Sequence, residues 1–235
     1  IFATGGETQK RAAKLLRGRS FYVSLLSECA ALRVLEVLDL PGTSQIINAA
    51  GKFLIVAPNT PQTVEKLAET QKALNDWFLT HAWGQSGIGL AWEPACCNDF
   101  LKGAGRTRPF AELIKRLFQR LEDIKLRRFD LCGAHPPAPL FTGYLDSFSA
   151  HGECQVDGRS PATRQIAEGV WVSALAADQM DIGRFLTQRD RVLITREPLT
   201  GKALKTLATP MFDYAISFTD DASETGWFGQ EARNG

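Results

Sequence analysis

The chain has 235 residues, of which 44% are hydrophobic, so it can bury one large core or two modest ones, and we expect two. Its 27 Lys and Arg nearly balance 26 Asp and Glu, so the total charge points to no particular partner. An odd number of cysteines, five, without regular spacing argues against a secreted disulfide scaffold and favours a reducing cytoplasm. The longest apolar run, residues 21–40, contains several charged side chains, so we expect no membrane span.

The first half of the chain has the pattern of an alternating helix and strand domain. Residues 8–17 and 20–38 repeat apolar side chains at helical spacing, and Pro41 with Gly42 should end this helical stretch. The β-rich runs at residues 45–47 and 53–56 flank a turn and predict a hairpin.

A second helix and a last strand complete this half. Thr60 can cap a helix that starts at Pro61 and continues to about His81, and residues 87–92 predict a strand. With Ile1 and Phe2 as the end of a truncated first strand, the order is β-α-β-β-α-β, that of a ferredoxin-like palm over residues 1–103.

The second half predicts a helical linker and a small α+β module, which makes the whole chain α+β. Residues 104–131 contain a basic amphipathic helix, and residues 132–235 form the module. Within it we expect a Gly-rich turn region at residues 152–158 and one short helix at residues 181–188. Three strands are expected at residues 169–173, 191–195 and 214–219.

Two segments carry a resemblance to a known family. One is Leu-Leu-Arg-Gly-Arg-Ser-Phe-Tyr at residues 15–22, and the other is Ala-Ala-Gly-Lys-Phe-Leu-Ile-Val-Ala-Pro-Asn at residues 49–59. In this order they resemble the first palm domain of the large, polymerase- and cyclase-like subunit of type III CRISPR effector complexes of the Csm type. The resemblance implies that the chain begins inside this domain, so we expect that Ile1 is not a native N-terminus.

The resemblance implies a function for the whole subunit. Such a subunit binds ATP and Mg²⁺ between two palms, makes cyclic oligoadenylate when target RNA is sensed and, in many members, cuts single-stranded DNA. Neither the family's histidine-aspartate nuclease motif nor its Gly-Gly-Asp-Asp motif occurs in this chain. We therefore expect it to form one wall of the ATP site and a docking surface for other effector subunits, guide RNA and target RNA, and to be inactive alone. The alternative is a noncatalytic RNA-binding or assembly module with a ferredoxin-like fold.

The resemblance also implies which residues contact the nucleotide. In the family the Arg-x-Arg-Ser-Phe segment lies where the two palms meet, and a Gly-Lys-Phe turn lies at the hairpin tip. The corresponding candidates here are Arg17, Arg19, Ser20, Gly51, Lys52 and Phe53. From the residues alone, a solvated helix start and an ordinary hairpin turn with an exposed lysine are equally good interpretations.

The basic helix is a candidate contact for RNA or an acidic subunit. Nine basic residues between Lys102 and Arg128 stand against only three acidic ones. Clustered cations of this kind can neutralise the phosphates of RNA. More often, however, the basic face of such a helix is simply exposed to solvent. The candidate contact residues are Lys115, Arg116, Arg120, Arg127 and Arg128.

The family's small inserted domain resembles a zinc module with two Cys-x-x-Cys pairs. Here Cys154 and Asp157 occupy the first pair while Ser173 and Ala176 occupy the second, so three thiolates are replaced and we expect this zinc site to be lost. An alternative set of four ligands is Cys132, His135, His151 and Cys154. Coincidence is the favoured interpretation of that set, because the Pro-rich segment between its two pairs need not fold back.

Overall fold

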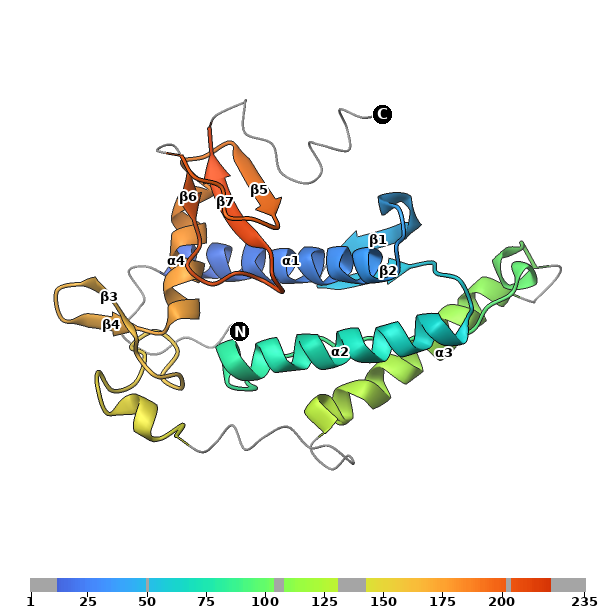
Figure 1. Ribbon diagram of the computed structural model, residues 1–235, viewed down its shortest axis with the longest axis horizontal. Helices are drawn as coiled ribbons and strands as arrows, with labels where there is room; N and C mark the ends of the chain where they lie inside the picture. The colour runs from blue at the N-terminus through green and yellow to red at the C-terminus, as the bar shows by residue number, and fades with distance from the viewer. Residues whose placement is uncertain (1–11, 50, 104–107, 131–142, 202–203, 221–235) are drawn as a thin grey trace.

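The computed structural model describes residues 12–49, 51–103, 108–130, 143–201 and 204–220. The long helix α1 (Ala12–Val37) runs through the middle of the molecule and is crossed by α4 (Ala174–Phe185), as Figure 1 shows. The other helices are α2 (Pro61–Ala82) and α3 (Pro109–Leu126). Short 3-10 turns occur at Gly42–Ser44, Cys97–Phe100, Arg128–Asp130 and Asp146–Phe148.

The elements predicted for residues 12–82 form largely as expected. Helix α1 is continuous through Gly18, so the two predicted helical runs are one element. Strands β1 (Gln45–Ala49) and β2 (Lys52–Ile55) pair antiparallel as the predicted hairpin. Thr60 caps α2, because its side chain accepts a hydrogen bond from the backbone N–H of Thr63, 3.2 Å away.

The strand predicted at residues 87–92 does not form. The amide side chain of Gln71 on α2 donates to the Ile88 carbonyl at 2.9 Å and accepts from the Leu90 N–H. One glutamine therefore occupies the backbone groups that a neighbouring strand would pair with. The segment also lies against α3, since a Cβ built on Gly89 would be only 2.9 Å from Ile124.

The second half contains two small antiparallel sheets. Strands β3 (Arg164–Ala167) and β4 (Val170–Val172) form a hairpin, while β5 (Arg191–Thr195), β7 (Ala215–Thr219) and β6 (Lys205–Thr206) form a sheet in the order β5-β7-β6. The helix predicted at residues 181–188 instead covers Ala174–Phe185. It starts earlier because the Ser173 hydroxyl caps it by accepting from the Ala176 N–H at 3.2 Å.

The larger of two apolar clusters in the described residues joins the two halves. It includes Tyr22 of α1, Phe78 of α2, Ile182 of α4 and Phe218 of β7, all at most 2% exposed. These mixed helices and antiparallel strands confirm the α+β class, while the ferredoxin-like sheet and the divisions at residues 103 and 132 stay predictions. In the described part of the chain, no helix combines the length and apolar character needed to cross a bilayer.

Candidate functional site

The Arg17-Gly18-Arg19 segment lies at the point where α1 crosses α4. A Cβ built on Gly18 would be 1.9 Å from the carbonyl oxygen of Gln179, and one on Gly183 would be 2.2 Å from the carbonyl oxygen of Lys14. Only a residue without a side chain allows the two backbones to approach this closely. The two glycines therefore determine how closely the helices pack.

The two arginines bind α4 on either side of this crossing. Arg17 donates to the backbone carbonyl of Gly183 at 3.2 Å, and Arg19 donates through Nε to the side-chain oxygen of Gln179 at 3.0 Å. Residues two apart on a helix lie about 200° apart around its axis, so the two side chains cannot line the same surface. Arg19 is buried while Arg17 and Ser20 are exposed. The segment is thus a helix junction rather than a solvated helix start.

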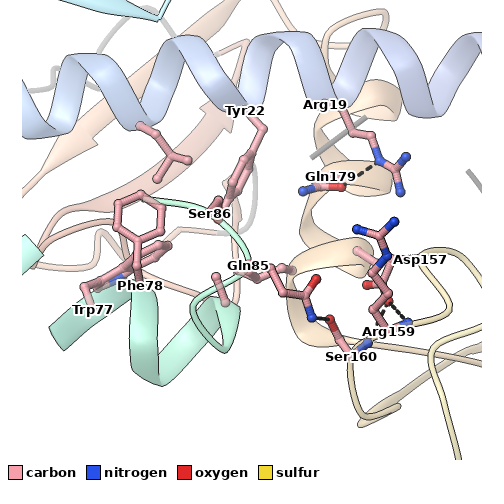
Figure 2. A pocket seen from close by; sticks show the side chains of 14 residues that line it. Arg19, Tyr22, Trp77, Phe78, Gln85, Ser86, Asp157, Arg159, Ser160 and Gln179 are labelled. Carbon is pink, nitrogen blue, oxygen red and sulfur yellow. Dashed lines mark hydrogen bonds between the residues drawn. The ribbon is translucent and has the colours of Figure 1, made fainter. Parts of the chain in front are cut away.

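The buried Arg19 lies beside a small pocket between α1, α2 and α4, shown in Figure 2. The pocket has a volume of about 60 Å³, enough for a few water molecules or a small polar group. Apolar side chains such as Phe78 and Trp77 line one end, and Asp157, Arg159 and Gln179 line the other.

Electrostatic effects oppose one another at this pocket. Burial lowers the pKa of the Arg19 guanidinium, while the nearby carboxylate of Asp157 acts to raise it. Burial also raises the pKa of Tyr22, whose hydroxyl has no hydrogen-bond partner among the described residues. A pocket with a cation, a carboxylate and an unsatisfied hydroxyl can hold water or a small polar ligand.

The hairpin tip contacts α1 one turn after the position of Arg19. Gly51 has a φ of 74°, and a Cβ built on it would be 3.2 Å from Val23 of α1. Val23 follows Arg19 by four residues and Ser20 by three, so both residues neighbour it on the surface of the helix. The Lys52 ammonium is exposed 5.1 Å from the centre of the Phe118 ring on α3, and Phe53 packs against the core.

The predicted nucleotide contacts differ in exposure. Ser20, Gly51 and Lys52 are exposed, whereas Arg19 is buried beside the pocket at α4. Their binding to a nucleotide stays a prediction. Sequence reasoning did not find Gln179, because nothing in its local pattern indicates that it faces Arg19 across 160 residues of chain.

The predicted contact residues of α3 also differ in their surroundings. Arg116 and Arg120 both form ion pairs with Glu93, the first at 2.8 Å. Lys115, Arg127 and Arg128 are exposed. Two of the five cations thus serve an intramolecular contact, and the other three are the better candidates for an external anionic partner.

The alternative zinc ligands can be followed only in part. Cys132 and His135 lie outside the described residues. His151 is exposed and stacks on Trp171, with ring centres 3.5 Å apart, whereas Cys154 is fully buried in an apolar cluster. In the ranges that the structure describes, no three His, Cys, Asp or Glu side chains are grouped so as to hold a metal ion.

A family model described as Csm1 subunit domain B matches residues 8–135, more than half of the chain. The chain belongs to the Csm1 family. A curated Csm1 relative from Thermococcus onnurineus, described as the CRISPR system single-strand-specific deoxyribonuclease Cas10/Csm1 of subtype III-A, is 34% identical over 156 residues. That similarity covers 64% of this chain and 18% of the relative.

Other Csm1 proteins extend the comparison. A relative of the same description from Mycobacterium tuberculosis is 25% identical over 126 residues, which cover 50% of this chain and 16% of that protein. A solved Csm1-Csm4 subcomplex of a type III-A CRISPR-Csm interference complex matches with a TM-score of 0.58 and 22% identity, over 90% of this chain and 23% of that one. At this identity the match shows a shared fold. The chain thus spans less than a fifth of these curated relatives.

Proposed function

We propose that this chain is part of the large subunit of a type III-A CRISPR effector complex and forms one wall of an ATP site for cyclic oligoadenylate synthesis. The observation that carries the proposal is the match of residues 8–135 to Csm1 subunit domain B. The partners would be other effector subunits, with guide and target RNA held by the complex. The solved structure that shares this fold belongs to a Csm1-Csm4 subcomplex, which supports such an assembly.

The same proposal includes a ferredoxin-like palm over residues 1–103. The described part of that range contains α1, β1, β2 and α2 in this order, which is the middle of the β-α-β-β-α-β sequence of elements. Both helices and the hairpin contact one core through Leu25, Leu74 and Phe53. This order and packing support a palm. Its first strand, predicted at residues 1–2, lies outside the described residues, and its last does not form at residues 87–92.

The nucleotide wall would include Ser20 of α1 and Lys52 at the hairpin tip. Both are exposed, and their hydroxyl and ammonium groups can donate hydrogen bonds to phosphate oxygens. The hairpin, residues 45–55, has no acidic residue. The carboxylates that bind Mg²⁺ would therefore come from another part of the complete subunit.

Replacing Lys52 by alanine in the complete subunit should reduce cyclic oligoadenylate synthesis at least about 10-fold, because a charge-assisted bond to phosphate is worth about 1.5–3 kcal/mol. Ser20→Ala should have a smaller effect in the same direction. Synthesis is measured with target RNA present, and assembly by gel filtration. The control is Lys72→Ala, an exposed lysine of α2. Unchanged synthesis in both variants would contradict the proposed wall.

The exposed cations of α3 favour a second candidate function, an RNA-binding or assembly module. Reversing Lys115, Arg127 and Arg128 to glutamate should weaken RNA retention. The plot of log affinity against log salt should become shallower, with a slope smaller in magnitude by about two or more. Filter binding of RNA between low and moderate salt measures this. Arg116 and Arg120 are left intact because their ion pairs with Glu93 support the fold. An unchanged slope would identify α3 as an ordinary solvated face.

A further inference from the structure

Two pairs of positions, each three residues apart, converge where the turn after Cys154 meets the start of α4. The carboxylate of Asp157 lies 3.1 Å from the hydroxyl of Ser173, the residue that caps α4. Cys154 and Ala176 are buried in the same apolar cluster, at 0% and 2% exposure. The four positions, from two segments of the chain, therefore lie in one small region of the module.

Four thiolates at these positions would have the ligand number and pairing of a structural zinc site. The residues present do not fit one. Cys154 is the only thiol among the four and Ala176 offers no donor atom. The Asp157 carboxylate is already used, because Oδ1 accepts from the backbone N–H groups of Arg159 and Ser160 at 2.9 and 2.8 Å, and Oδ2 accepts from Ser173.

These hydrogen bonds connect the same parts that a metal ion would connect. Asp157 closes its own turn through two backbone N–H groups and holds the start of α4 through Ser173. A carboxylate is stabilised there by the positive end of the helix dipole. The Arg19 side chain extends from α1 toward the same group in Figure 2, and Gln85, in the turn after α2, donates to Ser160 at 3.2 Å.

We propose that the Asp157 carboxylate replaces a structural metal in this module, so that the turn at residues 154–160 and helix α4 are held together without zinc. The fold of the module is then independent of metal. Because the four positions still converge, the substitutions Asp157→Cys, Ser173→Cys and Ala176→Cys together should create a tetrahedral thiolate site with Cys154.

The first experiment measures metal and thermal stability in the full chain carrying Cys132→Ala and His135→Ala, so that those two residues contribute no ligands. We expect no stoichiometric zinc by elemental analysis and the same Tm with and without a strong chelator. Asp157→Ala should lower Tm by roughly 5–10 °C, because three donors lose their acceptor. The control is Asp146→Ala, an exposed aspartate. One zinc per chain, with a Tm that falls on chelation, would overturn the proposal.

The second experiment adds the three cysteines to the same background and uses Co²⁺ as a probe. The triple variant should bind one Co²⁺ with the visible absorption of tetrahedral thiolate coordination and gain a Tm that depends on metal. Adding Cys154→Ser should remove most of that absorption. A folded triple variant without this absorption would show that the four positions do not converge, and the proposal would fail. If the triple variant does not fold, the first experiment still tests the proposal. A Tm that falls on chelation, or an Asp157→Ala variant with an unchanged Tm, would then contradict it.

Discussion

Gly18→Ala should destabilise the protein by about 3 kcal/mol or more. The new methyl group would be 1.9 Å from the Gln179 carbonyl oxygen, which belongs to the backbone of α4 and cannot rotate away. The two helices would have to separate, and this would strain the core that they share and weaken the Arg17 and Arg19 bonds to α4. At an ordinary helix position the same change would stabilise the protein by up to about 1 kcal/mol. The sign of the measured change therefore shows whether the two helices are in close contact at Gly18.

Chemical denaturation of the full chain measures this effect. Gly183→Ala should give a loss of similar size, since its methyl group would meet the Lys14 carbonyl oxygen at 2.2 Å. The matched control is Gly87→Ala, where the nearest atom would be at 3.4 Å, an ordinary contact distance. A neutral or stabilising Gly18→Ala would mean that α1 and α4 do not cross at this glycine.

Asp178→Ala should cost about 3 kcal/mol or more. This aspartate of α4 is fully buried and accepts hydrogen bonds from the backbone N–H groups of Ala208 and Thr209, both at 3.0 Å. Its carboxylate also pairs with Arg164 of β3 at 3.4 Å. Alanine would leave buried donors without an acceptor, which is the expensive case. Denaturation of the Asp181→Ala variant, whose half-buried aspartate pairs with Arg184 within α4, gives the control and should show a much smaller loss.

The pH dependence of Asp178→Asn tests the same site in a second way. Burial raises the pKa of the Asp178 carboxyl above its ordinary value of 3.8, although the surrounding hydrogen bonds and Arg164 act in the opposite direction. The folded state therefore holds this proton more tightly than the unfolded state does. That contribution to stability is complete below pH 3.8 and is lost as the pH rises through the higher folded-state pKa. The Tm of the natural chain relative to the asparagine variant should fall over this range, and a constant difference would contradict it.

The Arg-Gly-Arg-Ser segment illustrates how one motif can combine structural and proposed functional roles. Gly18 and Arg19 serve the contact with α4, which any mutational test of nucleotide binding must take into account. Loss of synthesis in an Arg19 variant would mix destabilisation with loss of a ligand contact. Lys52 is exposed at the hairpin tip, so it separates the two effects more cleanly.

Local elements could be predicted because their causes are local. The β1-β2 hairpin follows from β-rich runs around a turn, with Gly51 at a φ of 74° that favours glycine. The start of α2 follows from Thr60 and Pro61, which satisfy or remove the free N–H groups of a helix end. The resemblance to the CRISPR large subunit rested on short segments in the same region, and the family match confirms it.

The sequence by itself thus determined the family, the α+β class, the hairpin and the capped start of α2. The tertiary structure alone decided that Gln71 takes the backbone bonds of the expected strand at residues 87–92, and that Arg19 faces Gln179. It also decided that Asp157 holds Ser173 at the start of α4. Each of these contacts joins two separate segments of the chain, and its geometry depends on how closely those segments pack. Local propensity and periodicity carry no information about that distance.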